Sequence, residues 1–229
     1  WVQTTANPET LNVVLGQNVT GVNFGNFKTA SISGMKFLDA DADSVKDQNE
    51  NGLQGWTIKA IKGLSQKTAV TDANGAYSFS FGPSETGTWV ISEMLQIGWT
   101  QTYPANATYS VDVQSGTAMT NVDFGNYQGS SISGKKYEDV AGDSSTAGAP
   151  TLNGWTIQLY IGETLVASTT TSGDGDYEFS NLAPGNYIVQ EVLQDGWMQT
   201  YPEVGTYAVT ISSGSNLTGK DLKAEKLDE

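Results

Sequence analysis

Residues 37–56 read FLDADADSVKDQNENGLQGW, an apolar segment joined to a tryptophan by a run of acidic side chains. Counted from Asp39, the carboxylates follow the spacing D-x-D-x-D-x-x-x-D-x-x-E, which is that of a calcium-binding loop. So many carboxylates in one short turn repel one another unless a divalent cation neutralises them. The spacing therefore predicts a Ca²⁺ site. Its expected ligands are the side chains of Asp39, Asp41, Asp43 and Glu50 (bidentate), the carbonyl of Val45, and Asp47 directly or through water.

Two features separate this loop from an EF-hand. The sixth position, where a sharp turn usually requires glycine, is Ser44, and no amphipathic helix flanks the loop. We therefore expect an EF-hand-like loop between strands. The alternative interpretation is a solvated acidic turn without a metal.

Composition limits the function. The chain has 229 residues, enough for two domains, and its net charge of -14 without any arginine argues against nucleic-acid binding. It contains no histidine, the commonest general base, so a hydrolase is not expected. It contains no cysteine, so it has no disulfide. No apolar run approaches membrane-spanning length. We expect a non-enzymatic protein with no membrane insertion in this segment.

Several passages recur in the same order about one hundred residues apart, which indicates tandem domains. The pairs are SISGMKFLDA from Ser31 and SISGKKYEDV from Ser131, GLQGWTIKAI from Gly52 and LNGWTIQLYI from Leu152, GWTQTYPANATYSVDV from Gly98 and GWMQTYPEVGTYAVTI from Gly196, and VTGVNFGNF from Val19 and MTNVDFGNY from Met119. We predict domains at residues 29–128 and 129–229. Residues 1–28 match only the closing strands of such a unit, so either the front of a preceding sandwich is truncated or this segment donates strands to another chain.

The repeats predict β-structure throughout. Segments such as AYSFSF and TYSVDV alternate between apolar and polar residues, turn signals such as DANG separate them, and no window has helical periodicity. The fold class is therefore all-β, with tandem antiparallel β-sandwiches and no significant helix. The turns at Asp72/Asn74 and Asp174/Asp176 are interpreted as hairpin turns, with secondary cation sites as the alternative.

The later repeat has lost most of the acidic loop. It keeps Asp139 and Asp143, but Ala141 stands opposite Asp41, and small residues or Pro150 stand where Asp47 and Glu50 would fall. We expect it to bind calcium weakly or not at all.

Taken together, SGMKFLDADADSVKDQNENGLQGWTI, TDANGAYSF, GWTQTYP and VNFGN resemble the B domains of serine-aspartate-repeat adhesins and the B-type repeats of collagen adhesins. The chain also resembles the tandem repeats of large secreted surface proteins in methanogenic archaea and some bacteria. The resemblance implies a transthyretin-like sandwich that holds calcium in the loop after its first strand. It also implies an extracellular, cell-surface stalk or fibre module.

The resemblance to collagen adhesins further implies an isopeptide bond between a first-strand lysine and a last-strand asparagine, assisted by a glutamate. Here Lys36, Glu93 and Asn126 match that pattern, with Lys136 and Glu191 as a weaker second set that lacks the asparagine unless one such as Asn26 comes from another chain. The alternatives for Lys36 are a buried ion pair with Glu93 or a side chain that reaches water.

The leading functional hypothesis is a structural module of an extracellular filament, stalk or surface layer, rigidified by calcium and by intramolecular Lys–Asn isopeptide bonds. Its partners would be copies of itself or neighbouring domains, through strand donation. The alternative is an adhesin, or a carbohydrate- or protein-binding module, that uses exposed aromatic residues of the GWTQTYP and GWMQTYP loops. Glycosylation sequons at Asn18, Asn106 and Asn216 fall in expected turns.

Overall fold

The computed structural model describes residues 1–7, 10–143 and 145–227, and in them every helix or strand is a β-strand except the 3₁₀ turn η1 (Pro83–Glu85). The expected all-β fold is confirmed. Contacts between Cα atoms divide the chain into two compact units. The first comprises residues 1–38, 44–95 and 101–125, and the second comprises residues 39–43, 96–100 and 126–229.

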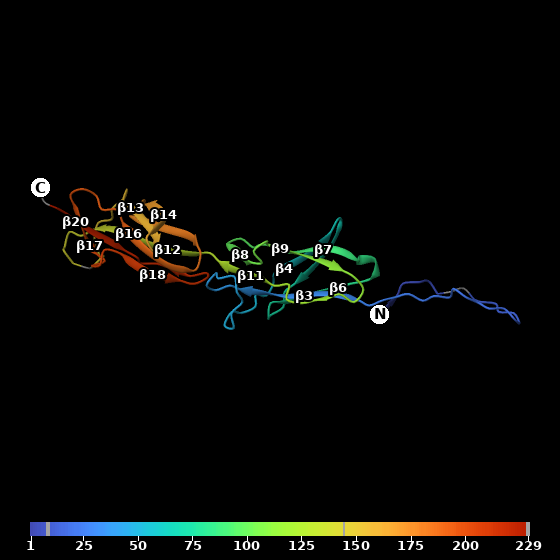
Figure 1. The fold of residues 1–229 in the computed structure, drawn as a ribbon. Coiled ribbons are helices and arrows are strands. Elements are labelled where there is room, and N and C mark those ends of the chain that lie inside the picture. Colours follow the sequence, from blue (N-terminus) through green and yellow to red (C-terminus); the bar gives the residue numbers. More distant parts are fainter. Residues whose placement is uncertain (8–9, 144, 228–229) are drawn as a thin grey trace. The chain divides into compact units, whose positions relative to one another are not determined.

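Strands β3 to β11 form the N-terminal sandwich, drawn in blue to green in Figure 1. One sheet has the order β10-β3-β11-β8, with β6 also paired to β3, and the other has the order β5-β4-β7-β9. The strands are β3 (Ala30–Leu38), β4 (Thr57–Lys62), β5 (Ser65–Val70), β6 (Ala76–Phe81), β7 (Gly87–Glu93), β8 (Trp99–Tyr103), β9 (Thr108–Val113), β10 (Ala118–Met119) and β11 (Phe124–Gln128).

The alternating sequence explains this sandwich. In β6, Tyr77, Phe79 and Phe81 are buried, whereas the residues between them are exposed, because successive side chains of a strand point to opposite faces. The Phe81 ring packs against Trp89 of the facing sheet, with 5.0 Å between the ring centroids. These aromatic residues fill the core together with β-branched side chains.

Strands β12 to β20 form the C-terminal sandwich, drawn in yellow to red in Figure 1. Its sheets have the orders β15-β12-β20-β17, with β19 also paired to β12, and β14-β13-β16-β18. The strands are β12 (Ser130–Glu138), β13 (Thr156–Ile161), β14 (Thr164–Thr170), β15 (Asp176–Leu182), β16 (Gly185–Glu191), β17 (Trp197–Tyr201), β18 (Tyr207–Ile211), β19 (Asn216–Leu217) and β20 (Leu222–Lys226). The strand order of the first sandwich therefore recurs in the second.

Two local expectations were wrong. The GWTQTYP and GWMQTYP passages are not loops, because their central residues form β8 and β17. Asn216 does not lie in a turn: it belongs to β19 and pairs with Ser131 of β12 in a parallel arrangement. Asn18 and Asn106 lie outside strands and are exposed.

The N-terminal segment contains a two-stranded antiparallel ribbon of β1 (Val2–Gln3) and β2 (Asn26–Phe27). Its register pairs Gln3 with Asn26. Strands β17 and β20 pair Gln199 with Ala224, and the sequence repeat aligns these two residues with Gln3 and Asn26. The ribbon therefore has the register of a repeat's closing strands. Among the described residues, no helix is long and apolar enough to cross a membrane.

Candidate metal and cross-link sites

The acidic loop starts where β3 ends at Leu38. The ligand atoms of Asp39, Asp41 and Asp43 all lie within 4.8 Å of one another, with Asp39 buried and the other two exposed. The backbone amide of Asp43 donates hydrogen bonds to Asp39 Oδ1 (3.1 Å) and Asp41 Oδ1 (3.3 Å). These bonds hold the carboxylates of Asp39 and Asp41 at the turn, and the three clustered carboxylates repel one another unless a cation lies between them.

The backbone of the loop shows why Ser44 replaces the expected glycine without preventing the turn. Ser44 has φ 67°, in the left-handed region, and so does Ala42 with φ 62°. A side chain in this region costs about 1 kcal/mol relative to glycine. At the position equivalent to Ala42, the second repeat has Gly142 with φ 62°. The loop therefore has the sharp turn that the calcium spacing requires, at a small cost in backbone strain.

The remaining predicted ligands, Val45, Asp47 and Glu50, lie in the second half of the loop. Glu50 is buried, and its Oε2 accepts a hydrogen bond from the Asp47 amide at 3.0 Å. The ammonium of Lys46 donates to the Glu50 carbonyl at 3.2 Å, whereas Val45 and Asp47 are exposed. The Glu50 carboxylate therefore stabilises the turn through one of its oxygens.

The equivalent loop of the C-terminal sandwich holds a lysine that the sequence analysis did not single out. Lys223 of β20 is 1% exposed, and its Nζ lies 2.9 Å from Asp139 Oδ1. The same ammonium lies 3.4 Å from Asp143 Oδ1, donates to the Ser145 carbonyl at 2.7 Å, and contacts the Asp143 carbonyl. Burial opposes ionisation of Asp139, but the Lys223 ammonium helps to hold the pKa of Asp139 below its ordinary value.

The predicted cross-link residues of the N-terminal sandwich are buried. Lys36 Nζ lies 2.9 Å from Glu93 Oε2, and the two side chains are 0% and 1% exposed. The same Nζ lies 4.4 Å from the centroid of the Trp56 ring and 3.4 Å from the Phe124 carbonyl. Asn126 is fully buried on β11, which neighbours β3 in the sheet order.

The C-terminal sandwich repeats the lysine and the glutamate. Lys136 Nζ lies 2.5 Å from Glu191 Oε2, both side chains are fully buried, and the Trp155 ring centroid is 4.3 Å from the ammonium. Burial lowers the pKa of Lys136 and raises that of Glu191, and the charge of each partner opposes the other's shift. Ala224, which is also buried, stands where the repeat alignment places Asn126.

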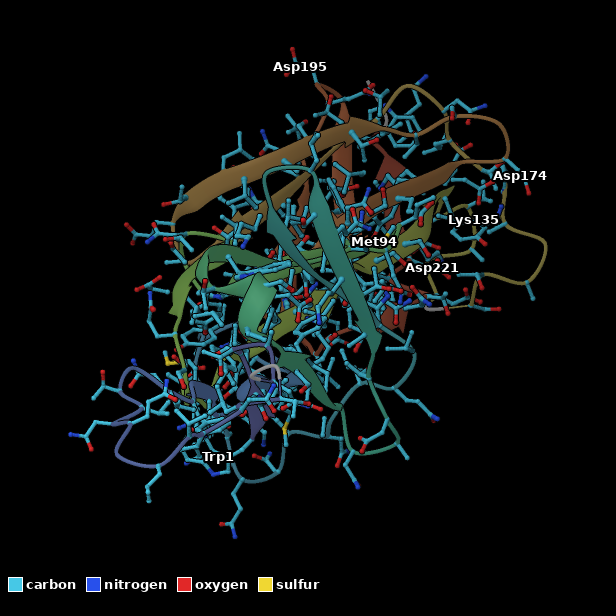
Figure 2. The ribbon with its side chains drawn as sticks, turned by 90° about the vertical axis from the view of Figure 1, so that its right-hand side faces the viewer. Trp1, Met94, Lys135, Asp174, Asp195 and Asp221 are labelled. Carbon is cyan, nitrogen blue, oxygen red and sulfur yellow. The ribbon has the colours of Figure 1, made fainter. Side chains whose placement is uncertain are left out.

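The two acidic hairpin turns have local partners. Asp72 Oδ1 accepts hydrogen bonds from the amides of Asn74 (2.8 Å) and Ala76 (2.9 Å), as aspartates in turns commonly do. Asp174 and Asp176 flank the Lys135 ammonium at 3.0 and 2.9 Å. Lys135 and Asp174 are labelled in Figure 2. Hydrogen bonds to Asp176 and Asp174 raise the pKa of Lys135.

The tryptophans that recur in both repeats are buried or half-buried. Trp56 and Trp155 are each 2% exposed, and Trp99 and Trp197 are half-buried. The Trp155 and Trp197 rings are nearly perpendicular, at 89°, with 5.3 Å between their centroids. A platform for sugar stacking requires exposed, coplanar ring faces, whereas Trp56 and Trp155 are buried and the Trp197 ring is nearly perpendicular to that of Trp155.

Comparison with known proteins agrees with this architecture. The SdrD B-like domain family matches residues 130–227. These residues are similar to an SdrD B-like domain. The chain is 28% identical over 210 residues to serine-aspartate repeat-containing protein D of Staphylococcus aureus, covering 83% of the chain and 16% of that protein. It is also 28% identical over 186 residues to protein F of Staphylococcus epidermidis, covering 73% of the chain and 11% of that protein.

The chain thus spans less than a fifth of the length of these curated relatives. Among solved structures, the Bacillus anthracis TIE protein is similar with a TM-score of 0.40 and 18% identity, over 87% of this chain and 34% of that one. The minor pilin GBS52 of Streptococcus agalactiae is similar with a TM-score of 0.36 and 13% identity, over 87% and 97% of the two chains. The expected relation to serine-aspartate-repeat adhesins is confirmed.

Proposed function

We propose that this chain is a structural stalk or filament segment of a cell-surface protein, stiffened by Ca²⁺ in the loop 39–50 and by a covalent cross-link in the N-terminal sandwich. SdrD B-like repeats are non-enzymatic, and the relatives are extracellular surface proteins. The convergence of Asp39, Asp41 and Asp43 is the observation that carries the proposal.

Calcium suits this loop because hard cations bind to several oxygen ligands in flexible geometry. The three aspartates supply carboxylates, and the proposal adds the Val45 carbonyl, Asp47 and Glu50 from the same stretch of chain. The ion would replace electrostatic repulsion with attraction and would tie the end of β3 to the following segment. A stalk gains rigidity from such a loop because the loop then no longer moves independently of the sheet.

Calorimetric titration of the metal-free chain with Ca²⁺ tests this site. We expect one site, and Asp41→Asn should weaken its affinity about tenfold or more, because affinity in such loops depends on the number of charged ligands. The matched control is Asp143→Asn in the second loop, which should leave the titration unchanged. Absence of heat in the unmodified chain, or equal effects of the two substitutions, would contradict the proposal.

The proposed cross-link joins Lys36 to Asn126. The neutral amine of Lys36 attacks the carboxamide carbon of Asn126, a new Nζ–C bond forms, and the amide nitrogen leaves as ammonia. Glu93, in its protonated form, would polarise the carbonyl, transfer its proton to the leaving nitrogen and take up the proton that Nζ loses. The side chains of Lys36 and Glu93 are 0% and 1% exposed and Asn126 is fully buried, which supports this step because the three groups would then react away from water.

Intact mass of the denatured protein measures the cross-link. We expect a mass below that of the sequence by one ammonia molecule. Lys36→Met should abolish the deficit, whereas Lys136→Met should leave it unchanged, because Ala224 offers no carboxamide to the second lysine. An unshifted mass in the unmodified chain would rule the bond out.

We further propose that residues 1–28 are the closing strands of another sandwich, whose remaining strands come from the same protein or from a second copy. The register shared by the β1/β2 and β17/β20 pairs supports this assignment. Exposed apolar side chains in this segment, such as Val14 and Phe24, would be covered in that sandwich. Exposed Asn18, Asn106 and Asn216 are the proposed glycan acceptors.

A further inference from the structure

Lys223 has an unusual position for a charged residue. Its strand neighbours Leu222 and Ala224 are fully buried and belong to the core of the C-terminal sandwich. Because side chains alternate along a strand, Lys223 points to the outer face of the sheet, where a lysine would normally reach solvent. Here it is 1% exposed, and the atoms that surround its ammonium belong to residues of the loop after β12.

The contacts of the ammonium are those of a bound cation. Two carboxylates, of Asp139 and Asp143, and two backbone carbonyls, of Asp143 and Ser145, converge on Nζ. We infer that Lys223 is the resident cation of this loop: its ammonium occupies the place of a metal ion, holds the loop on the sheet and excludes divalent ions. The inference concerns only the C-terminal sandwich and does not depend on calcium in the first loop.

The charges of the two loops agree with this assignment. Residues 39–50 contain five carboxylates, whereas residues 139–150 contain two, Asp139 and Asp143. A monovalent ammonium with three donors leaves a small residual charge in the second loop, but it would leave a large one in the first. The loop in which a lysine takes the place of the metal is therefore also the loop that lacks carboxylates at the positions of Asp41, Asp47 and Glu50.

The packing of the N-terminal sandwich shows that the lysine could not simply be added there. The repeat aligns Lys223 with Gly125, and a Cβ on Gly125 would lie 2.5 Å from the Phe37 ring. Phe37 is 1% exposed, whereas its equivalent Tyr137 is half-buried. In the first sandwich a ring covers the glycine, and in the second a lysine side chain starts from the same position.

Hydrogen exchange of the full chain, read separately on peptides from residues 39–50 and 139–150, tests the inference. In the unmodified chain, exchange of the second peptide should be the same in EDTA and in Ca²⁺. Lys223→Met should raise its exchange in EDTA by about tenfold or more, because a buried carboxylate loses its partner. Added Ca²⁺ should then reverse the increase, since the oxygen ligands remain and the ammonium no longer blocks them. The control Lys135→Met, which breaks an exposed ion pair of the same sandwich, should change neither peptide.

Calcium-dependent protection of residues 139–150 in the unmodified chain would overturn the inference. A folded Lys223→Met chain in which hydrogen exchange of residues 139–150 is unchanged would also overturn it. The same holds if exchange rises in this variant and added Ca²⁺ does not lower it again. If Lys223→Met does not fold, the lysine ammonium signals of the unmodified chain in nuclear magnetic resonance decide instead. A slowly exchanging ammonium that is unaffected by Ca²⁺ supports the inference, and one that shifts or exchanges rapidly contradicts it. The calcium proposal for residues 39–50 is judged on the other peptide, so each can fail alone.

Discussion

Replacing Glu191 by alanine should lower the free energy of unfolding of the C-terminal sandwich by about 3–5 kcal/mol, the usual cost of leaving a buried charge without its partner. The side chains of Lys136 and Glu191 are fully buried at 2.5 Å, and the Trp155 ring lies beside the ammonium. Without the carboxylate, Lys136 must either remain charged in an apolar environment or lose its proton. Chemical denaturation followed by peptides of β15 and β16 in hydrogen exchange measures the change.

The loss should depend on pH with a definite sign. Burial lowers the pKa of Lys136, and the charge of Glu191 partly offsets this shift, so the folded-state pKa falls further in Glu191→Ala. The unfolded chain then binds more protons than the folded one between that lowered pKa and the ordinary value of 10.5. Stability of the variant should therefore rise with pH across this interval, and a fall would contradict the assignment.

Two controls separate charge burial from loss of packing. The double replacement Lys136→Met with Glu191→Leu removes both charges while keeping apolar volume, and it should be neutral or stabilising. Lys135→Met breaks ion pairs to Asp174 and Asp176 that are exposed to solvent, and it should leave the stability nearly unchanged. A double variant as unstable as Glu191→Ala would show that the pair contributes through its packing.

The local strand pattern could be predicted from sequence with good accuracy. AYSFSF and TYSVDV correspond to β6 (Ala76–Phe81) and β9 (Thr108–Val113) because alternation along a strand is a local property. Strand β8 (Trp99–Tyr103) was interpreted as a loop because glycine and proline bound it closely. Its structure comes from pairing in a sheet with strands distant in sequence, which no local pattern records.

The candidate sites also differ in how far they could be predicted from local sequence. The clustered aspartates at 39, 41 and 43 lie close in sequence, so their spacing was sufficient to predict that they converge. Burial of Lys36 could be predicted from its apolar neighbours on the strand. Lys223 could not, because alternation places it on the outer face and its partners Asp139 and Asp143 are far away in the sequence. The replacement of Gly125 by Lys223 in the repeat was the available signal.

Removal of Ca²⁺ should destabilise the N-terminal sandwich and spare the C-terminal one. A ligand that binds only the folded state stabilises it by mass action, and free Ca²⁺ a thousandfold above its dissociation constant contributes about 4 kcal/mol. For a sandwich of this size that corresponds to a fall of more than about 10 °C in unfolding temperature on chelation. The five carboxylates of residues 39–50 would lose the proposed Ca²⁺ counter-ion, whereas Asp139 and Asp143 keep their contacts with Lys223.

Hydrogen exchange during a temperature series resolves the two sandwiches, since β6 (Ala76–Phe81) and β15 (Asp176–Leu182) give peptides from one core each. In EDTA we expect the β6 peptide to open at the lower temperature, with the β15 peptide unchanged. Asp41→Asn in Ca²⁺ should reproduce much of the loss, and Asp143→Asn should not alter the β6 peptide. Equal responses of both cores to chelation, or no response in either, would contradict the proposal. In that case Ca²⁺ would not distinguish the loop at residues 39–50 from the loop that Lys223 stabilises.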